Sequence, residues 1–80
     1  MTNGEKYDDV FISTFGVTKE QLADLKYGEI SFWDSVGHMS LIAAIESAFG
    51  VMLEGEDIIG LDSYSKGKEI LSETKYGVVF

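Results

Sequence analysis

The chain has 80 residues, 45% of them hydrophobic, with fourteen acidic residues against six lysines and a net charge of −8. This size predicts a single domain over residues 1–80, with a core of about residues 4–76 and an apolar tail at 77–80. The acidic charge argues against nucleic-acid and anionic-membrane partners and favours partners with basic docking surfaces, while the lack of cysteine excludes disulfides and thiolate metal sites.

The first predicted element is a helix over residues 4–15. Four apolar residues recur there at steps of three and four, which places them on one helical face: Tyr7, Val10, Phe11 and Phe15. Gly16 follows, as expected for a left-handed cap that ends a helix. This helix should bury its aromatic face in the core.

A short helical turn is predicted next, over residues 19–25. Thr18 and Gln21 have the spacing of a capping box, and Val17 and Leu22 occupy the positions of a hydrophobic staple. The connection continues to Asp34, and its apolar residues should pin it to the domain: Leu25, Ile30, Phe32 and Trp33. We expect Trp33 in the core, with a wall beside a functional site as the alternative.

A second long helix is predicted over residues 35–49. Asp34 and Ser35 both suit a helix start, and Gly50 suits its end. Apolar residues at helical spacing predict its buried stripe: Met39, Ile42, Ile45 and Phe49. The Ser35 hydroxyl should therefore be exposed near the positive end of the helix dipole, where a phosphate ester is favoured.

The last third of the chain predicts two further helices. Ile58, Ile59 and Leu61 form a short apolar turn after an acidic segment, and a final helix, capped by Asp62 or Ser63, runs to about residue 75. Its inner face should comprise Tyr64, Gly67, Ile70, Leu71 and Thr74. Gly67 should permit close helix approach, Gly77 should stop the helix, and Val78, Val79 and Phe80 should pack back onto the domain.

The run Asp34-Ser35-Val36, placed before such a helix, resembles the attachment motif of the acyl carrier protein family. The order of elements is similar over nearly the whole chain. The resemblance implies an all-α four-helix bundle, with three longer helices, a short third helix and a long loop between the first two. It also implies that a phosphopantetheinyl transferase, using coenzyme A and magnesium, attaches 4′-phosphopantetheine to Ser35, and that Asp34 helps to recruit it.

The same resemblance implies a non-catalytic protein that presents acyl thioesters to enzymes of fatty-acid, polyketide or related specialised biosynthesis. One stripe of the second helix supplies its expected docking positions: Val36, Ser40, Ala43 and Ser47. Glu46, also expected to contact partners, is the one acidic residue between Ser35 and Gly50, a departure from the acidic helix that is common in these carriers. Glu54, Glu56 and Asp57 are therefore expected to supply the negative footprint, which favours a specialised pathway.

Other functions remain open on sequence alone. An aminoacyl or peptidyl carrier would use the same arm, and an unmodified acidic adaptor would use helix faces alone. Ser35 and His38, three residues apart, suggest a nucleophile–base pair, but a triad needs a water-excluding cleft that one exposed helical turn does not supply. His38 is expected at the surface or in an interface.

Two further expectations concern ions and location. Glu54, Glu56, Asp57 and Asp62 do not have the spacing of a calcium-binding loop, so a solvated acidic patch is favoured over a metal site. No apolar run is long enough to span a bilayer, and no secretory signal is evident. These features predict a soluble, intracellular, cytoplasmic monomer.

Overall fold

In the computed structural model, which describes residues 1–80, the polypeptide forms five helices and no strands. They are α1 (Asn3–Phe15), the 3₁₀ helix η1 (Lys19–Asp24), α2 (Ser35–Phe49), α3 (Gly55–Gly60) and α4 (Tyr64–Leu71). Three of these helices have at least eight residues. The all-α class predicted from the sequence is therefore confirmed.

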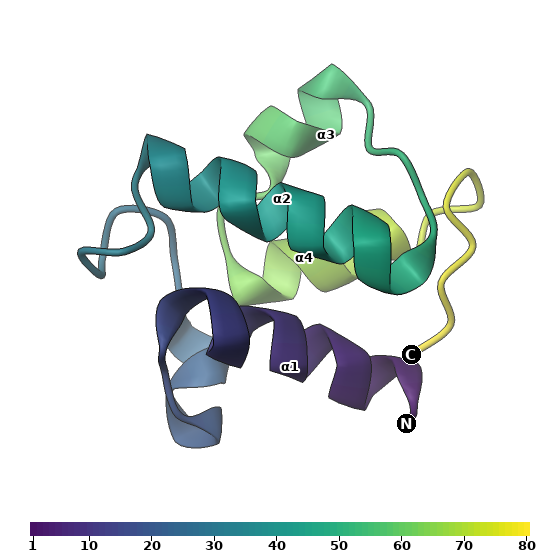
Figure 1. Cartoon of the computed structure of the whole chain (residues 1–80). Helices are drawn as coiled ribbons and strands as arrows, with labels where there is room; N and C mark the ends of the chain where they lie inside the picture. The colour runs from purple at the N-terminus through teal and green to yellow at the C-terminus, as the bar shows by residue number, and fades with distance from the viewer.

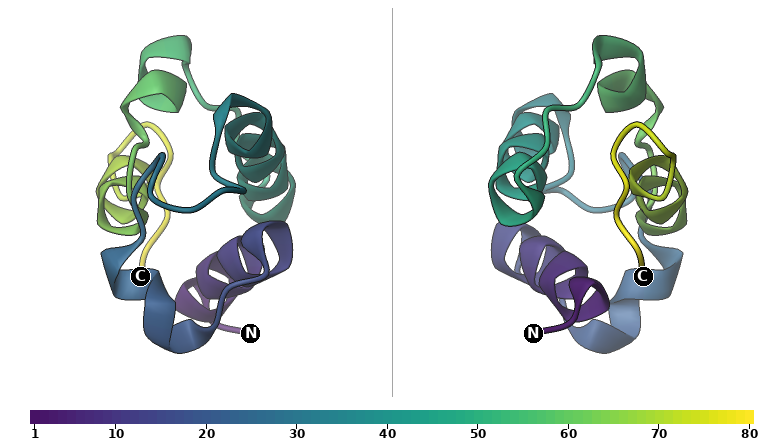
Figure 2. Two further views of the ribbon diagram at one scale, coloured as in Figure 1. Left: turned by 90° about the vertical axis from the view of Figure 1, so that its left-hand side faces the viewer. Right: turned by 90° about the vertical axis from the view of Figure 1, so that its right-hand side faces the viewer.

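The helices enclose one core from two sides. Helices α1 and α2 lie side by side, while α4, η1 and the C-terminal tail face them across the core, and α3 lies at the top, over the α4 side (Figures 1 and 2). Sixteen buried residues form this core, and all of them are hydrophobic. The two ends of the chain meet, because the Asn3 amide donates a hydrogen bond to the carbonyl of Val79 at 2.9 Å.

Aromatic side chains from α1 and the loop before α2 fill the centre of the core. Trp33 is fully buried and stacks on Phe15, with 5.1 Å between the ring centroids. Phe11 meets both Tyr7 and Trp33, at 4.9 and 5.6 Å. The predicted face of α1 is thus confirmed, as is the core position of Trp33. The long α1–α2 connection is held down by the tryptophan at its end.

The local signals of the first half gave correct helix ends. Gly16 and Gly50 adopt the left-handed conformation, with φ of 67° and 64°, and end α1 and α2. In η1, the backbone N–H of Thr18 donates to the Gln21 side chain at 2.8 Å. The two staple residues, Val17 and Leu22, are both buried.

Helix α4 ends four residues earlier than predicted, at Leu71 rather than residue 75. The N–H of Val78 donates to the carbonyl of Leu71 at 3.0 Å, so the returning tail occupies an acceptor that a longer helix would use. Val78 is buried, as predicted for the tail, but Val79 is exposed. Thr74 lies outside the helix and is exposed, contrary to prediction.

Two other burial predictions were also wrong. Met39 is 55% exposed, and Leu41 takes its predicted place beside Ile42 and Ile45 in the core. At the start of α2 no element covers the Met39 side, since α3 lies above and leaves a groove. Phe32 is 69% exposed, because its neighbour Trp33 occupies the space in the core.

Gly67 permits the close approach of α4 to α1, as its position in the sequence predicted. A Cβ atom there would lie 2.1 Å from the Tyr7 hydroxyl, which is buried and donates to the carbonyl of Tyr64 at 2.6 Å. Burial also raises the pKa of Tyr7, so this hydroxyl keeps its proton. The ring has little freedom to move away.

We therefore expect Gly67→Ala to lower the free energy of unfolding by about 1–2 kcal/mol, since the steric overlap outweighs the gain in helix propensity. Urea denaturation measures the change. Gly55→Ala is the matched control, because a Cβ atom there meets nothing within 4 Å. Equal unfolding midpoints for the two variants would contradict the close-packed helix crossing.

Candidate functional site

Helix α2 begins at Ser35 because Asp34 caps it. The Asp34 carboxylate accepts a hydrogen bond from the N–H of Gly37 at 2.8 Å, and its carbonyl accepts from the N–H of His38. Ser35 occupies the first helical position, is exposed, and forms no side-chain hydrogen bond. Of the two candidate caps, Asp34 takes the structural role, and the Ser35 hydroxyl is left free.

Gly37 allows the loop before α2 to pack closely against the first turn of the helix. A Cβ atom at Gly37 would lie 1.7 Å from the carbonyl oxygen of Phe32. The loop that precedes α2 therefore rests directly on the backbone of its first turn. Glycine is required here for close approach, and the position of Ser35 is fixed by backbone packing on one side and the Asp34 cap on the other.

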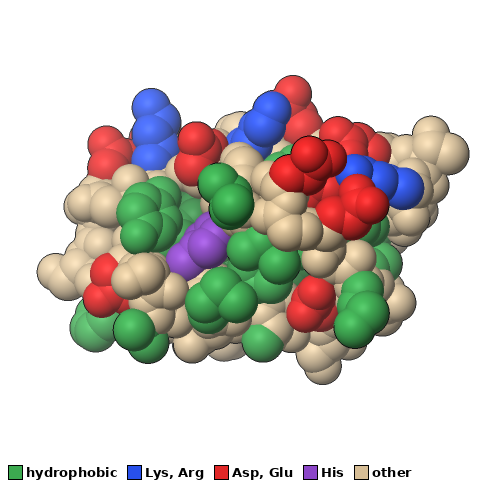
Figure 3. All heavy atoms as spheres, turned by 90° about the horizontal axis from the view of Figure 1, so that it is seen from above, with side chains coloured by type: hydrophobic (Ala, Val, Ile, Leu, Met, Phe, Trp, Pro, Cys, Tyr) green, Lys and Arg blue, Asp and Glu red, His purple; other side chains and the backbone are tan.

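A groove of about 430 Å³ opens beside Ser35, between the start of α2, α3 and Tyr27. Its lining is mostly apolar, with one polar edge formed by Ser35 and Asp62. The residues that line it are Tyr27, Ser35, His38, Met39, Ile58, Ile59, Leu61 and Asp62. Figure 3 shows the single histidine of the chain at this surface between hydrophobic side chains, with acidic and lysine side chains gathered beyond them.

His38 connects three parts of the domain beneath this groove. Its Nδ1 accepts a hydrogen bond from the Trp33 indole N–H at 2.9 Å, which leaves Nε2 protonated to donate to the carbonyl of Ile58 at 2.6 Å. Both ring nitrogens are occupied by structural partners. His38 therefore cannot act as the base for Ser35, and the predicted surface or interface role is replaced by a half-buried link between α2 and α3.

The other side of α3 is held by the segment after α4. The Tyr76 hydroxyl donates to the Asp57 carboxylate at 2.6 Å and accepts from the N–H of Glu54 at 2.8 Å. The Lys75 ammonium lies 2.5 Å from Glu54 and 2.8 Å from Asp57. Helix α3 buries no residue of its own, so these polar contacts and His38 hold the outer wall of the groove.

Most of the predicted acidic recognition residues also have partners within the domain. Glu54 and Asp57 face Lys75, and Glu46 accepts a hydrogen bond from the N–H of Leu53 at 2.9 Å, which stabilises the turn after α2. Glu56 alone among the four predicted acidic positions is exposed without a partner. No cluster of three or more metal-ligating side chains is formed. The α2 stripe itself is exposed as predicted: Val36, Ser40, Ala43 and Ser47.

The contacts of Asp57 predict a pH dependence of stability. Hydrogen bonds from Lys75 and then Tyr76 lower the pKa of Asp57 below its ordinary value. Folding is therefore favoured above the unfolded pKa of about 4, and this contribution is lost as the pH falls through the lower folded pKa.

We expect Asp57→Asn to lower the urea midpoint at pH 7, and the difference from wild type to shrink toward about pH 2.5, because below the unfolded pKa the charged carboxylate no longer favours the folded state as strongly. Glu56→Gln is the control, since Glu56 is exposed and has no hydrogen bond. An Asp57→Asn deficit that is equally large at both pH values would contradict the charged contact.

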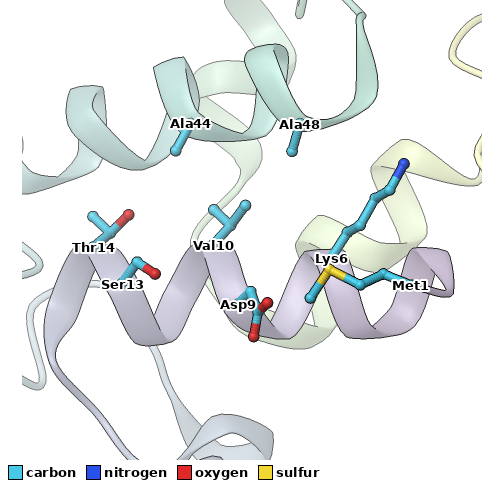
Figure 4. A pocket seen from close by; sticks show the side chains of 8 residues that line it. All are labelled: Met1, Lys6, Asp9, Val10, Ser13, Thr14, Ala44 and Ala48. Atoms are coloured by element: carbon cyan, nitrogen blue, oxygen red, sulfur yellow. The ribbon is translucent and has the colours of Figure 1, made fainter.

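A second cavity, of about 370 Å³, lies between α1 and α2. Figure 4 shows Ala44 and Ala48 of α2 pointing toward α1, where Val10 and Thr14 point back toward them. The Ser13 hydroxyl, the Lys6 amine and the Asp9 carboxylate are spread along α1 and do not converge. Small side chains at a helix crossing account for this cavity, so the groove beside Ser35 is the better candidate site.

Sequence reasoning found Ser35 and Asp34 but missed most of the groove. Tyr27 and Ile59 gave no functional signal, because a groove is created by tertiary packing of segments that are distant in sequence. None of the helices is long and apolar enough to cross a lipid bilayer. No known protein family, curated protein or solved structure matched this chain.

Proposed function

We propose that this domain is a carrier: it holds acyl intermediates as thioesters on a 4′-phosphopantetheine arm attached to Ser35 and presents them to partner enzymes. The observation that carries the proposal is the Ser35 hydroxyl, which is exposed, free of hydrogen bonds and located at the edge of an apolar groove. The helix order gives further support, with a long connection before α2 and a short α3 before the last helix. The domain itself would perform no chemistry.

The residues around Ser35 fit such a group. A phosphodiester on its oxygen would lie at the N-terminus of a 15-residue helix, where unpaired N–H groups and the helix dipole favour negative charge. When bound, the arm supplies a terminal thiol that forms thioesters. The apolar side chains of the groove, Met39 and Ile59 among them, provide a surface that excludes water beside it.

Tethering explains why a domain without catalytic groups would be useful. A substrate attached to Ser35 reaches each docked enzyme at a high effective concentration, without being released into solution. Each docking interface must be small and each complex short-lived, because the carrier has to leave one enzyme before it binds the next. A phosphopantetheinyl transferase and acyl-transferring enzymes are the partners that this proposal requires.

An aminoacyl or peptidyl carrier is the second candidate. The first three turns of α2 carry no acidic side chain, and Glu46 near its end accepts a hydrogen bond from Leu53 in the segment that follows. An acyl carrier that docks to its enzymes through an acidic second helix would be expected to have acidic residues at these positions. Their absence favours the aminoacyl or peptidyl carrier. Loading the thiol form with activated fatty acids and with activated amino acids separates the two carriers.

The proposal predicts covalent modification at one serine. The purified protein is incubated with coenzyme A, magnesium and a broad-specificity phosphopantetheinyl transferase, and its intact mass is measured. We expect the wild type to gain one phosphopantetheine group, Ser65→Ala to gain it equally, and Ser35→Ala to gain none. Ser65 is the control because it is an exposed helical serine outside the predicted docking stripe. A folded wild type that gains no mass would favour the acidic adaptor instead.

A further inference from the structure

Four large apolar side chains are exposed around Ser35. Val36 is 76% exposed, Met39 55%, Ile59 82% and Tyr27 45%. We call these four residues the apolar face. Exposed side chains of this size cost solvation free energy in an isolated domain, and contiguous patches of them mark interaction sites in soluble proteins.

The members of the apolar face are contiguous. Met39 and Val36 are three residues apart on α2, so their side chains are neighbours on the helix surface. Tyr27, Met39 and Ile59 line the groove that also contains Ser35. The view onto α2 and α3 shows hydrophobic side chains gathered around the histidine, with charged side chains on several sides of them (Figure 3). A partner that reaches Ser35 must cover this face.

The charges near this face are few and mostly paired. No residue between Asp34 and Glu46 is Asp, Glu, Lys or Arg, and both ring nitrogens of His38 are occupied by hydrogen bonds within the domain. Glu46 accepts a hydrogen bond from the backbone of Leu53, and Lys75 forms ion pairs with Glu54 and Asp57. The Asp34 carboxylate accepts a hydrogen bond that caps α2. Asp62 is the one carboxylate in the groove lining, and its side chain forms no hydrogen bond or ion pair. A basic partner surface would therefore meet no carboxylate on α2 itself from Ser35 to Ile45, despite the net charge of −8.

We propose that the enzymes that act at Ser35 dock on the apolar face through an apolar, uncharged surface of their own. The inference rests on the proposed carrier function and specifies its partner chemistry. Association driven by apolar burial is insensitive to ionic strength, whereas pairing of exposed charges is screened by salt. Salt dependence therefore distinguishes this docking mode from recognition of an acidic helix.

The phosphopantetheinyl transferase serves as the probe partner. Its KM for the wild-type domain is measured at saturating coenzyme A in about 0.05 M and about 0.5 M NaCl, and we expect a change of less than about threefold. Val36→Ala and Ile59→Ala should each raise the KM by about fivefold to tenfold, with little change in kcat, because they remove apolar contact area. Val79→Ala is the matched control, since Val79 is 79% exposed and lies in the C-terminal tail.

The outcomes separate the two proposals. If the wild type is modified but Val36→Ala and Ile59→Ala behave as Val79→Ala does, or if salt raises the KM tenfold or more, the docking inference is overturned and the carrier function stands. A wild type that is not modified overturns both. Sedimentation of the domain alone provides one further check. If the wild type is a dimer and Val36→Ala is a monomer, a second copy of the chain covers the apolar face and the inference is overturned.

Discussion

Trp33→Ala is expected to leave the domain largely unfolded at 25 °C. The indole is completely buried and contacts Phe11, Phe15 and His38. Removing a large buried aromatic side chain costs about 3–5 kcal/mol, which matches the whole stability of about 5 kcal/mol expected for so small a domain. Circular dichroism and urea denaturation measure the loss.

Trp33→Phe separates the packing of this side chain from its hydrogen bond. Phenylalanine keeps most of the apolar volume but leaves Nδ1 of His38 without the indole donor. We expect a smaller loss of about 1–2 kcal/mol and a folded domain. If Trp33→Ala instead unfolded at the same urea concentration as the wild type, Trp33 could not be the residue that anchors the α1–α2 connection.

Gly37→Ala is expected to lower stability by about 2–3 kcal/mol, although alanine is the better helix former. The added methyl group would lie 1.7 Å from the carbonyl oxygen of Phe32, and a backbone atom cannot move aside as a side chain does. Either the loop before α2 or the first turn of the helix has to shift. The same shift moves Ser35, so the variant should also be modified more slowly by the transferase.

Gly60→Ala is the control for this prediction. A Cβ atom at Gly60 meets nothing within 4 Å, and the residue ends a short helix. Its unfolding midpoint should stay close to that of the wild type. A Gly37→Ala variant that is more stable than the wild type would mean that helix propensity dominates at this position and that the loop does not hold Ser35 in place.

The parts of the fold set by local signals were predictable. The bounds of α2, the glycine that ends it and the aromatic face of α1 all follow from caps and helical spacing, which act within a few residues. The exposure of Ser35 followed from the same signals, because Asp34 next to it is a strong helix cap. Local sequence was sufficient wherever local contacts decide the structure.

The parts set by distant contacts were not predictable. Helix α4 ends at Leu71 because Val78 returns to bond its carbonyl, and His38 is buried between Trp33 and Ile58. Met39 has the spacing of a core residue, yet α3 leaves it uncovered. Each outcome depends on tertiary contacts between segments that are distant in sequence. A single sequence does not show which of its segments make such contacts.

The pairing of the acidic residues also could not be predicted from the sequence. Counting charges predicted a negative docking surface at Glu54, Glu56 and Asp57, and it did not predict that Lys75 pairs with Glu54 and Asp57. Lys75 follows Glu54 by twenty-one residues, too far for any local pattern to connect them. The net charge of the chain therefore did not predict how charges are distributed on the surface around Ser35.

Locating the added group by fragmentation mass spectrometry tests the carrier function most directly. After reaction of the wild type with coenzyme A and the transferase, the peptide that contains residues 34–36 is isolated and fragmented. The account predicts that all of the added phosphopantetheine mass lies on Ser35. Modification of any other residue, or an unmodified Ser35 in a folded protein, would contradict it.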